Sequence, residues 1–488
     1  MSERAPRARW FALVALCTGM LMIVVDQTIV NVALPAIQRD LGFSQSNLAW
    51  VVNAYLIAYG GLLLLSGRIG DLIGRKRIFI TGLVLFTAAS LLCGISTSAE
   101  MLVAARFVQG VAGAVASAVI LGMVVTLFPE PREQARAIGV FSFVAAIGGS
   151  IGLLAGGVLT QAINWHWIFL VNLPIGIAAA VLGARLLEPE RGIGLARGAD
   201  LAGALLITSA LMLGIYTIVE TERYGWVSAH TLGLGGLALA LLAAFVARQA
   251  TARAPLVPLR VFRSRGVAGA NLIGALMVPG MFGFFFLGTL YLQRVLGYGA
   301  LGVGLAILPV TLVGGVLSLR VSARLNVRFG LRAVLLPSLV VIALGLAWFV
   351  RAPVHGTYAT DVLPAMLALG VGAGLGFPAL MSLAMADATP GDAGLASGLI
   401  NTTQMVSGAL GLAVLVTLAA SHTARLLAAG TPLPAALTGG YHLAFALGTA
   451  LVAAALLVAA LAVTGRERTS ETAQGPMGAL PVADQRDG

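Results

Sequence analysis

Long apolar stretches, separated by short polar segments, recur along the whole chain. A helix that crosses a bilayer needs roughly 17–25 predominantly apolar residues, and by this rule the pattern predicts about fourteen membrane-spanning helices. The expected spans are residues 10–34, 48–66, 78–97, 101–128, 136–161, 166–187, 200–219, 230–249, 266–292, 300–319, 332–350, 362–385, 396–420 and 441–464. The chain is therefore predicted to be an all-α polytopic membrane protein.

A weak internal repeat divides these spans into two sets. Gly67–Arg77 follows the second span and Ala323–Arg332 follows the tenth, with Gly74 matching Gly330. Duplicated six-helix halves are typical of transporters that bind substrate between the halves. The expected domains are an N-terminal six-helix bundle at 1–187, two inserted spans with cytoplasmic linkers at 188–265, a C-terminal six-helix bundle at 266–464 and a disordered cytoplasmic tail at 465–488.

Composition and charge agree with a membrane protein. Hydrophobic residues make up 59% of the 488 and charged residues 10%, which leaves no room for a large soluble domain. The net charge of +11 comes from basic residues that fall mostly on one side of the expected spans. This is the positive-inside pattern, so both termini are expected in the cytoplasm, and the charge is interpreted as topology rather than nucleic-acid binding.

Two charged residues stand inside apolar spans, Asp26 and Arg106. A charge in the hydrocarbon costs at least ~2.5–3.5 kcal/mol, so such residues indicate a functional site. Counted from the helix ends at 1.5 Å per residue, Asp26 lies ~12 Å deep and Arg106 ~8 Å deep, so contact between them is possible. A proton-coupling pair is the preferred interpretation, and a static structural ion pair is the alternative.

Six motifs in order give the chain a family resemblance. It resembles the major facilitator superfamily and, within it, the fourteen-span drug:proton antiporters of the EmrB/QacA-like branch. The motifs are Asp26–Pro35, Gly67–Arg77, Arg106–Gly110, Trp165–Pro174, Tyr291–Gly297 and Asn401–Gln404. Two positions depart from the family pattern: His166 stands where arginine is usual, and Leu153 where the antiporter motif has proline.

The resemblance implies further site residues. The loop residues Gly67, Arg68, Asp71, Gly74 and Arg75 are expected to latch one conformation at the cytoplasmic face. Positive-inside topology alone is the alternative, but it gives no reason for Asp71. A second set forms a helix-packing gate in the fifth span, where small residues at four-residue spacing let helices approach closely; plain packing is the alternative. The gate residues are Gly148, Gly152, Gly156 and Gly157.

A substrate cavity between the halves is expected to combine amides with adaptable apolar side chains, which suit bulky amphiphilic ligands. Interhelical hydrogen bonding is an equal alternative for the amides of the thirteenth span, and core or lipid-facing packing for the Met and Phe residues. The cavity residues are Gln27, Asn31, Gln109, Met281, Phe282, Phe285, Asn401 and Gln404.

The sequence thus predicts a proton-coupled exporter of amphiphilic drugs or secondary metabolites in the bacterial cytoplasmic membrane, acting by alternating access and conferring resistance. Alternatives are an exporter of a lipid or small endogenous metabolite and a non-transporting receptor on the same fold. No P-loop, HExxH or CxxC motif is present, so an enzyme is not expected, nor a metal or other cofactor. The expected partners are the cargo, protons and the lipid bilayer, not nucleic acid, with the chain acting as a monomer.

Overall fold

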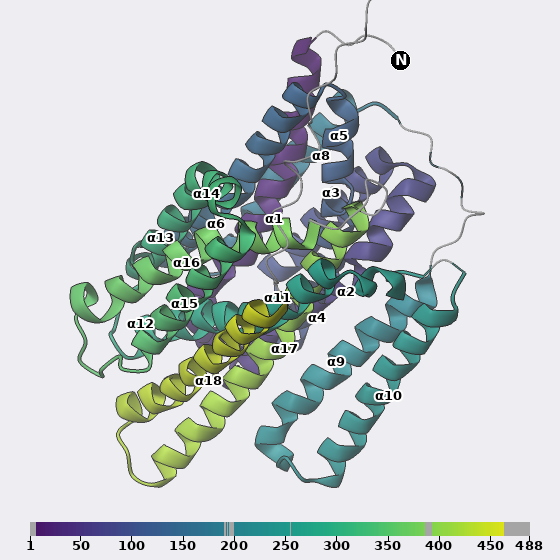
Figure 1. Cartoon of the computed structure of the whole chain (residues 1–488). Helices are drawn as coiled ribbons and strands as arrows, with labels where there is room; N and C mark the ends of the chain where they lie inside the picture. Colours follow the sequence, from purple (N-terminus) through teal and green to yellow (C-terminus); the bar gives the residue numbers. More distant parts are fainter. Residues whose placement is uncertain are drawn as a thin grey trace, which may run out of the picture.

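The computed structural model describes residues 6–189, 192, 194, 200–253, 255–385 and 393–462, and within these ranges the regular structure is helical (Figure 1). Among the described residues, thirteen helices are long and apolar enough to cross a membrane. The remaining expected span is occupied by α6, Pro131–Ala162, which is 32 residues long. The prediction of an all-α polytopic membrane protein is confirmed.

The helices of the N-terminal half are α1 Pro6–Leu41, α2 Trp50–Ile73, α3 Arg75–Gly94, α4 Ala99–Ser117, α5 Ile120–Leu127, α6 Pro131–Ala162, α7 Trp167–Leu170 and α8 Asn172–Leu186. The inserted pair is α9 Leu201–Tyr224 and α10 Ala229–Thr251. The C-terminal half holds α11 Arg265–Gly283, α12 Thr289–Arg294, α13 Ala300–Leu317, α14 Ala323–Phe329, α15 Leu331–Phe349, α16 Leu363–Met385, α17 Ala393–Ala428 and α18 Leu433–Ala462.

The ninth expected span is irregular at a different place from the one the sequence suggests. Proline removes a backbone donor and crowds the preceding turn, so a break is expected at Pro279. Instead α11 runs through Pro279, and a π-helical turn follows at Phe284–Gly288. Gly411 of α17 packs against the Pro279 ring, where a Cβ atom would collide with it. The close packing of α17 against the Pro279 ring thus stabilises a continuous α11 at this position.

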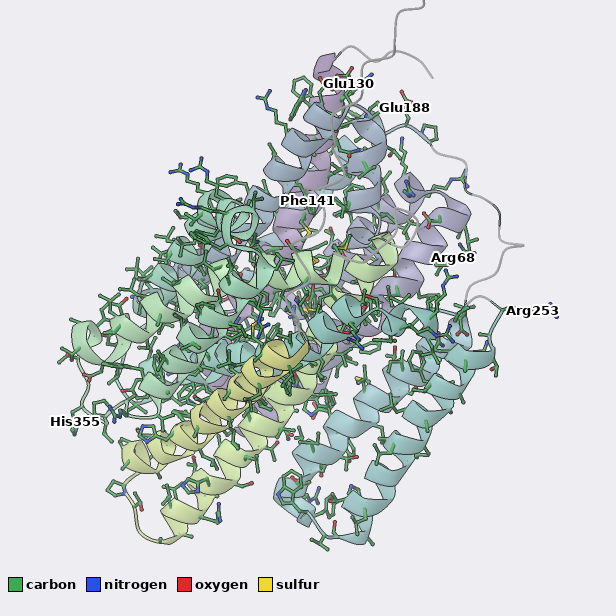
Figure 2. The ribbon with its side chains drawn as sticks, in the orientation of Figure 1. Arg68, Glu130, Phe141, Glu188, Arg253 and His355 are labelled. Carbon is green, nitrogen blue, oxygen red and sulfur yellow. The ribbon has the colours of Figure 1, made fainter. Side chains whose placement is uncertain are left out.

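Helix ends meet at two opposite faces of the bundle. At the Asp40 end, the Trp165 indole N–H donates to Asp40, and Gly94 O contacts the His166 ring. At the Arg68 end, Lys76 Nζ donates to Ala184 O, 2.8 Å away. Figure 2 shows Arg68, Glu130, Glu188 and Arg253 along the upper and right side, and His355 at the opposite, lower-left end. The loops therefore alternate between two faces, as spans crossing a bilayer require.

The two halves touch along two seams. One joins α6 to α13, and the other joins α2 to α17. In the second seam a Cβ atom on Gly60 would lie 2.8 Å from Met405 Cβ, so the helix backbones are close. Within the N-terminal half α1 packs against α6 and α8, while α4 packs against α2 and α3. These contacts bring α1, α2, α3, α4 and α8 around one point.

The inserted pair stands beside the bundle (Figure 1), with α9 against both α2 and α17. Asp200 caps α9 by accepting from the Gly203 N–H and also accepts from Gln249 of α10. Its Oδ1 pairs with Arg248 Nε at 2.5 Å. Burial raises the pKa of Asp200, but the hydrogen bonds from Arg248, Gly203 and Gln249 outweigh burial and leave the pKa below its usual value.

The sequence repeat marks the same backbone break in both halves. Gly74, between α2 and α3, has φ 114°, and Gly330, between α14 and α15, has φ 83°. Side chains rarely adopt these conformations, which glycine reaches without steric cost. The alignment of Gly74 with Gly330 therefore identifies equivalent turns.

Candidate functional site

Five helices of the N-terminal half converge on Asp26. Asp26 of α1 has 0% exposure and Arg106 of α4 has 1%. Arg106 Nη1 lies 2.6 Å from Asp26 Oδ2, so the two charges form a direct ion pair. The structure brings together the two residues that the sequence identified as charges inside apolar spans.

Arg106 is held on several sides. Its Nε donates to the Val51 carbonyl of α2 at 2.9 Å, and Nη1 also donates to Gln109 Oε1 at 2.7 Å. The guanidinium carbon stands 4.4 Å from the centre of the Tyr55 ring. The site offers several fixed acceptors and the face of an aromatic ring. A planar guanidinium with several donors fits such a site, and the ammonium group of lysine does not.

The carboxylate receives further hydrogen bonds. Asp26 Oδ1 accepts from Gln109 Nε2 and from Asn172 Nδ2, each at 2.8 Å. Gln109 Nε2 also donates to Ser90 Oγ at 2.8 Å. Ser90, Gln109 and Asn172 are all 0% exposed. Taking two charges out of water is costly, and only good geometry with additional hydrogen bonds compensates for it. This network supplies both.

Sequence reasoning missed Ser90 and Asn172 as members of this network. Asn172 lies within the Trp165–Pro174 motif, and its amide in an apolar stretch was the available signal. It is the first residue of α8, and α8 begins after the break that follows α7. Ser90 gave no signal, because serine is common in membrane helices and can bond its own backbone.

Gln109, which is expected in the substrate cavity, lies in the Asp26 network in this structure. Its side chain is fully buried, and both ends of its amide bond within the Asp26 network. Arg106 and Gln109 are separated by one helical turn, so the face they share points at Asp26. Met281, also expected in the cavity, is 4% exposed.

The other expected cavity residues lie on separate halves. Gln27 Nε2 donates to the Tyr55 hydroxyl at 3.4 Å, and Asn31 Nδ2 donates to the backbone of its own helix. In the C-terminal half, Phe282 packs against Gly408 of α17, and Gln404 lies beside Gly274 of α11. Gln27, Phe282, Phe285, Asn401 and Gln404 are partly exposed.

The expected latch forms a compact contact at the Arg68 end. Arg75 Nη2 of α3 lies 3.1 Å from Asp71 Oδ1 of α2, four residues earlier in the chain. Arg75 Nη1 also donates to Gly122 O of α5 at 3.4 Å. Gly74 provides the turn between them, and Gly67 lies near Ala118 of the α4–α5 break. Asp71 thus orients Arg75 toward α5.

The expected gate glycines pack on two different partners. Gly148, Gly152 and Gly156 face α1: a Cβ atom on Gly156 would lie 2.5 Å from Ile29 O. Gly157 faces the other half, where a Cβ atom would lie 2.8 Å from Leu301 Cα. The glycines therefore seat α6 on α1 and at the same time set the distance between the halves.

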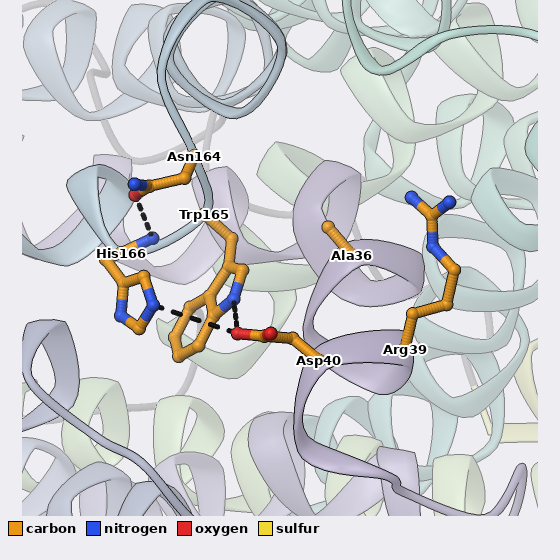
Figure 3. Close-up of a pocket in the computed structure, with 6 residues that line it drawn as sticks. All are labelled: Ala36, Arg39, Asp40, Asn164, Trp165 and His166. Atoms are coloured by element: carbon orange, nitrogen blue, oxygen red, sulfur yellow. Dashed lines mark hydrogen bonds and ion pairs between the residues drawn. The ribbon is translucent and has the colours of Figure 1, made fainter.

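A shallow hollow of about 490 Å³ opens at the Asp40 end (Figure 3). Its walls are α1 and the loop before α7. Trp165 stacks on His166 with ring centres 3.8 Å apart. Among the described residues no group of His, Cys, Asp or Glu is placed to hold a metal ion. The lining residues are Ala36, Arg39, Asp40, Asn164, Trp165 and His166.

Comparison with known proteins gives the family. The model of the Major Facilitator Superfamily matches residues 16–412. The puromycin resistance protein pur8 of Streptomyces alboniger is 39% identical, over 92% of this chain and 90% of that protein. The cephamycin export protein CmcT of Amycolatopsis lactamdurans is also 39% identical, over 93% and 91%. The probable actinorhodin transporter of Streptomyces coelicolor is 36% identical, over 84% and 72%.

Solved structures share the fold. A bacterial homologue of the human lysosomal transporter Spinster, in an inward-facing and unoccupied conformation, superposes with a TM-score of 0.66. Its sequence is 15% identical, and the match covers 94% of this chain and 98% of that one. At this identity the likeness shows the fold alone.

Proposed function

The chain belongs to the major facilitator superfamily, and we propose that it is a proton-coupled exporter of amphiphilic antibiotics or related secondary metabolites. It is a multi-pass transporter of the bacterial cytoplasmic membrane, not an enzyme. The names of the relatives support export: they include puromycin resistance and cephamycin export. A small amphiphilic cargo of this class would confer resistance when it is carried outward.

The single observation that carries proton coupling is the buried pair of Asp26 and Arg106 at 2.6 Å. Asp26 can bind a proton, whereas arginine stays charged. A proton on Asp26 removes the attraction between the two groups and changes the hydrogen bonds around them. A ligand or proton shifts a conformational equilibrium only by its differential affinity for the two states. The environment of the Asp26 carboxyl depends on the positions of the surrounding helices, so its affinity for a proton differs between the two states.

The proposal includes the arrangement of the chain in the membrane. The halves at 1–187 and 266–464 rock about the cargo site, with the inserted pair in 188–265 alongside, as in the fourteen-span antiporter branch. Both termini and the Arg68 end face the cytoplasm, because the basic loops gather there. The Asp40 end then faces outward. The contacts of Gly157 and Gln161 with the start of α13 lie at this outer end.

The test uses the purified chain in proteoliposomes with an imposed pH gradient. Puromycin is the first cargo, followed by a panel of antibiotics, and a pH-sensitive dye reports proton movement on addition of cargo. Cargo should drive proton flux in the wild type, and Asp26→Asn should abolish the response to the gradient.

Asp361→Asn is the matched control. Asp361 is a carboxylate at a helix start, where its Oδ2 accepts from the Thr357 N–H at 2.7 Å, and an amide oxygen replaces it there. This variant should transport like the wild type. Transport by Asp26→Asn that still follows the pH gradient would refute proton coupling at this site.

A further inference from the structure

Asn172 is bonded at only one end of its amide. Its Nδ2 donates to Asp26 Oδ1 at 2.8 Å and approaches Ser90 Oγ at 3.4 Å. Its Oδ1 is buried and has no hydrogen-bond partner. Buried side-chain polar atoms are usually paired, so this lone carbonyl beside the ion pair requires an explanation.

Gln109 carries the same chemical group in the same network, but both of its ends are bonded. Its Oε1 accepts from Arg106, and its Nε2 donates to Asp26 and to Ser90. Turning this amide over would place its N–H groups against the guanidinium. Because arginine keeps its charge, Gln109 is fixed in one orientation. Asn172 is not fixed, since its carbonyl loses no partner when the amide turns.

Protonation of Asp26 changes what its neighbours must offer. An ionised carboxylate only accepts hydrogen bonds, whereas the protonated acid has an O–H group to donate. Arg106 continues to donate to Oδ2, so the proton belongs on Oδ1. Both side chains bonded to Oδ1, Gln109 and Asn172, present N–H donors. One of them must turn to accept the new O–H.

We propose that Asn172 is the positioning residue that responds to the proton on Asp26, by turning its amide over; the inference rests on the proposed proton coupling. A hydronium ion transfers one proton to Asp26 Oδ1 and leaves as water, and the new O–H donates to Asn172 Oδ1. The Ser90 hydroxyl is placed to donate to the same oxygen. One O–H bond of hydronium breaks as the O–H bond on Asp26 forms, and the pair changes from net neutral to a single positive charge on Arg106.

The turn has a conformational consequence. After it, Asn172 Nδ2 points to the side where its carbonyl had no partner. The Asn172 N–H groups therefore lack an acceptor in this arrangement of the helices. Protonation thus favours a different arrangement, in which an acceptor lies on that side of Asn172. Such a difference in affinity is what couples a ligand to a change of state. Asn172 begins α8, which packs on α1 and α3, so the preference acts on three helices.

The other charged or titratable groups around Asp26 are few. Arg106 comes from α4, Tyr55 from α2 and Cys93 from α3, where the Cys93 thiol donates to Gln109 Oε1 at 3.5 Å. Tyrosine and cysteine ordinarily titrate well above neutral pH. A carboxylic-acid band that appears on acidification of the wild type and is lost in Asp26→Asn is therefore assigned to Asp26.

The test is infrared difference spectroscopy of the reconstituted full chain, with isotope-labelled asparagine, between alkaline and acidic pH. A carboxylic-acid C=O band should appear in the wild type and be absent from Asp26→Asn. In step with it, an amide C=O band should move to lower frequency as the carbonyl gains hydrogen bonds. That band should be absent from Asn172→Thr, which identifies residue 172.

Transport provides a second measurement with a matched pair of variants. Threonine has a hydroxyl that both donates and accepts, and valine has the same shape without it. Asn172→Thr should retain gradient-driven transport. Asn172→Val should lose about tenfold or more, the effect of losing a hydrogen bond to a charged group.

The outcomes separate the two proposals. An Asp26 acid band without movement of the Asn172 band would overturn the amide turn and leave proton coupling intact. Absence of the acid band, together with gradient-driven transport by Asp26→Asn, would overturn proton coupling itself. Because Asn172→Val can fail to fold, the labelled wild-type spectrum decides the matter without it.

Discussion

Replacing Gly157 by alanine is expected to push the two halves apart at the Asp40 end. The new Cβ atom would lie 2.8 Å from Leu301 Cα and 2.9 Å from Ala300 O, whereas carbon atoms at rest stand about 3.5–4.0 Å apart. The atoms in the way belong to the backbone of α13, so no side chain can swing aside. The seam itself must open by several tenths of an ångström or more.

The magnitude follows from the cost of overpacking. Inserting a methyl group into a tight contact costs about 1–3 kcal/mol. That cost applies only while α6 and α13 touch, so it shifts the equilibrium between the two states by about 5- to 150-fold. The ratio of molecules with this seam closed to molecules with it open falls by this factor.

Two neighbouring glycines provide controls on the same helix. Gly156→Ala would press on Ile29 O of α1, at 2.5 Å, within one half. It should lower thermal stability and leave the equilibrium between states unchanged. Gly149→Ala would meet only Thr28 Cγ2, at 3.9 Å, and should behave like the wild type.

The assay is pulsed electron spin resonance between labels at Ile163 and His355, both exposed at the Asp40 end. The native cysteines are buried, so labelling is selective. Gly157→Ala should increase the fraction of molecules at the longer distance. An unchanged distribution, or an equal shift with Gly149→Ala, would refute the assignment of this seam as a gate.

Three other predictions concern charge and backbone. Arg106→Lys should reduce transport strongly and destabilise the chain by about 1–3 kcal/mol. One ammonium group cannot serve all the acceptors, so a buried acceptor is left unpaired. Cargo flux measures the loss of transport, and thermal melting measures the loss of stability. Asp200 has a lowered pKa in the folded state. Its contribution to stability is therefore present above the ordinary aspartate pKa of about 3.9 and is lost as the pH falls through the pKa of the folded state. The melting temperatures of wild type and Asp200→Asn should converge on acidification below pH ~4. Gly74→Ala should cost about 1–3 kcal/mol through backbone strain and also reduce transport, whereas Gly330→Ala, at the equivalent turn, should lower the melting temperature with a smaller effect on flux.

Most of the fold could be predicted from the sequence because each membrane helix is a continuous run of apolar residues. It also located Asp26 and Arg106, since a charge in such a run is costly and therefore conspicuous. The break after α4 and the π-helical turn before α12 were not predicted. They depend on contacts with neighbouring helices, as the seating of Pro279 against Gly411 illustrates.

The neighbours of the ion pair were harder to predict for a different reason. Gln109 shares a helix face with Arg106, yet that pattern fits a cavity wall and a buried network equally well. Asn172 and Ser90 come from other helices, and only the packing of α8 and α3 on α1 brings them to Asp26. Helical spacing reports which residues share a face but not what that face meets.

The α9 helix leans on α2 and α17 at once, and α2 and α17 belong to different halves. If the two halves rock as proposed, α9 cannot keep both contacts fixed, and one of them must slide in each transport cycle. On the α2 side Thr208 packs closely against Gly61, where a Cβ atom would lie 2.7 Å from the Thr208 hydroxyl oxygen. Its companion α10 is largely exposed, which is the burial expected of a spanning helix that faces lipid. The fluidity of the lipid annulus is therefore expected to set part of the drag on this carrier.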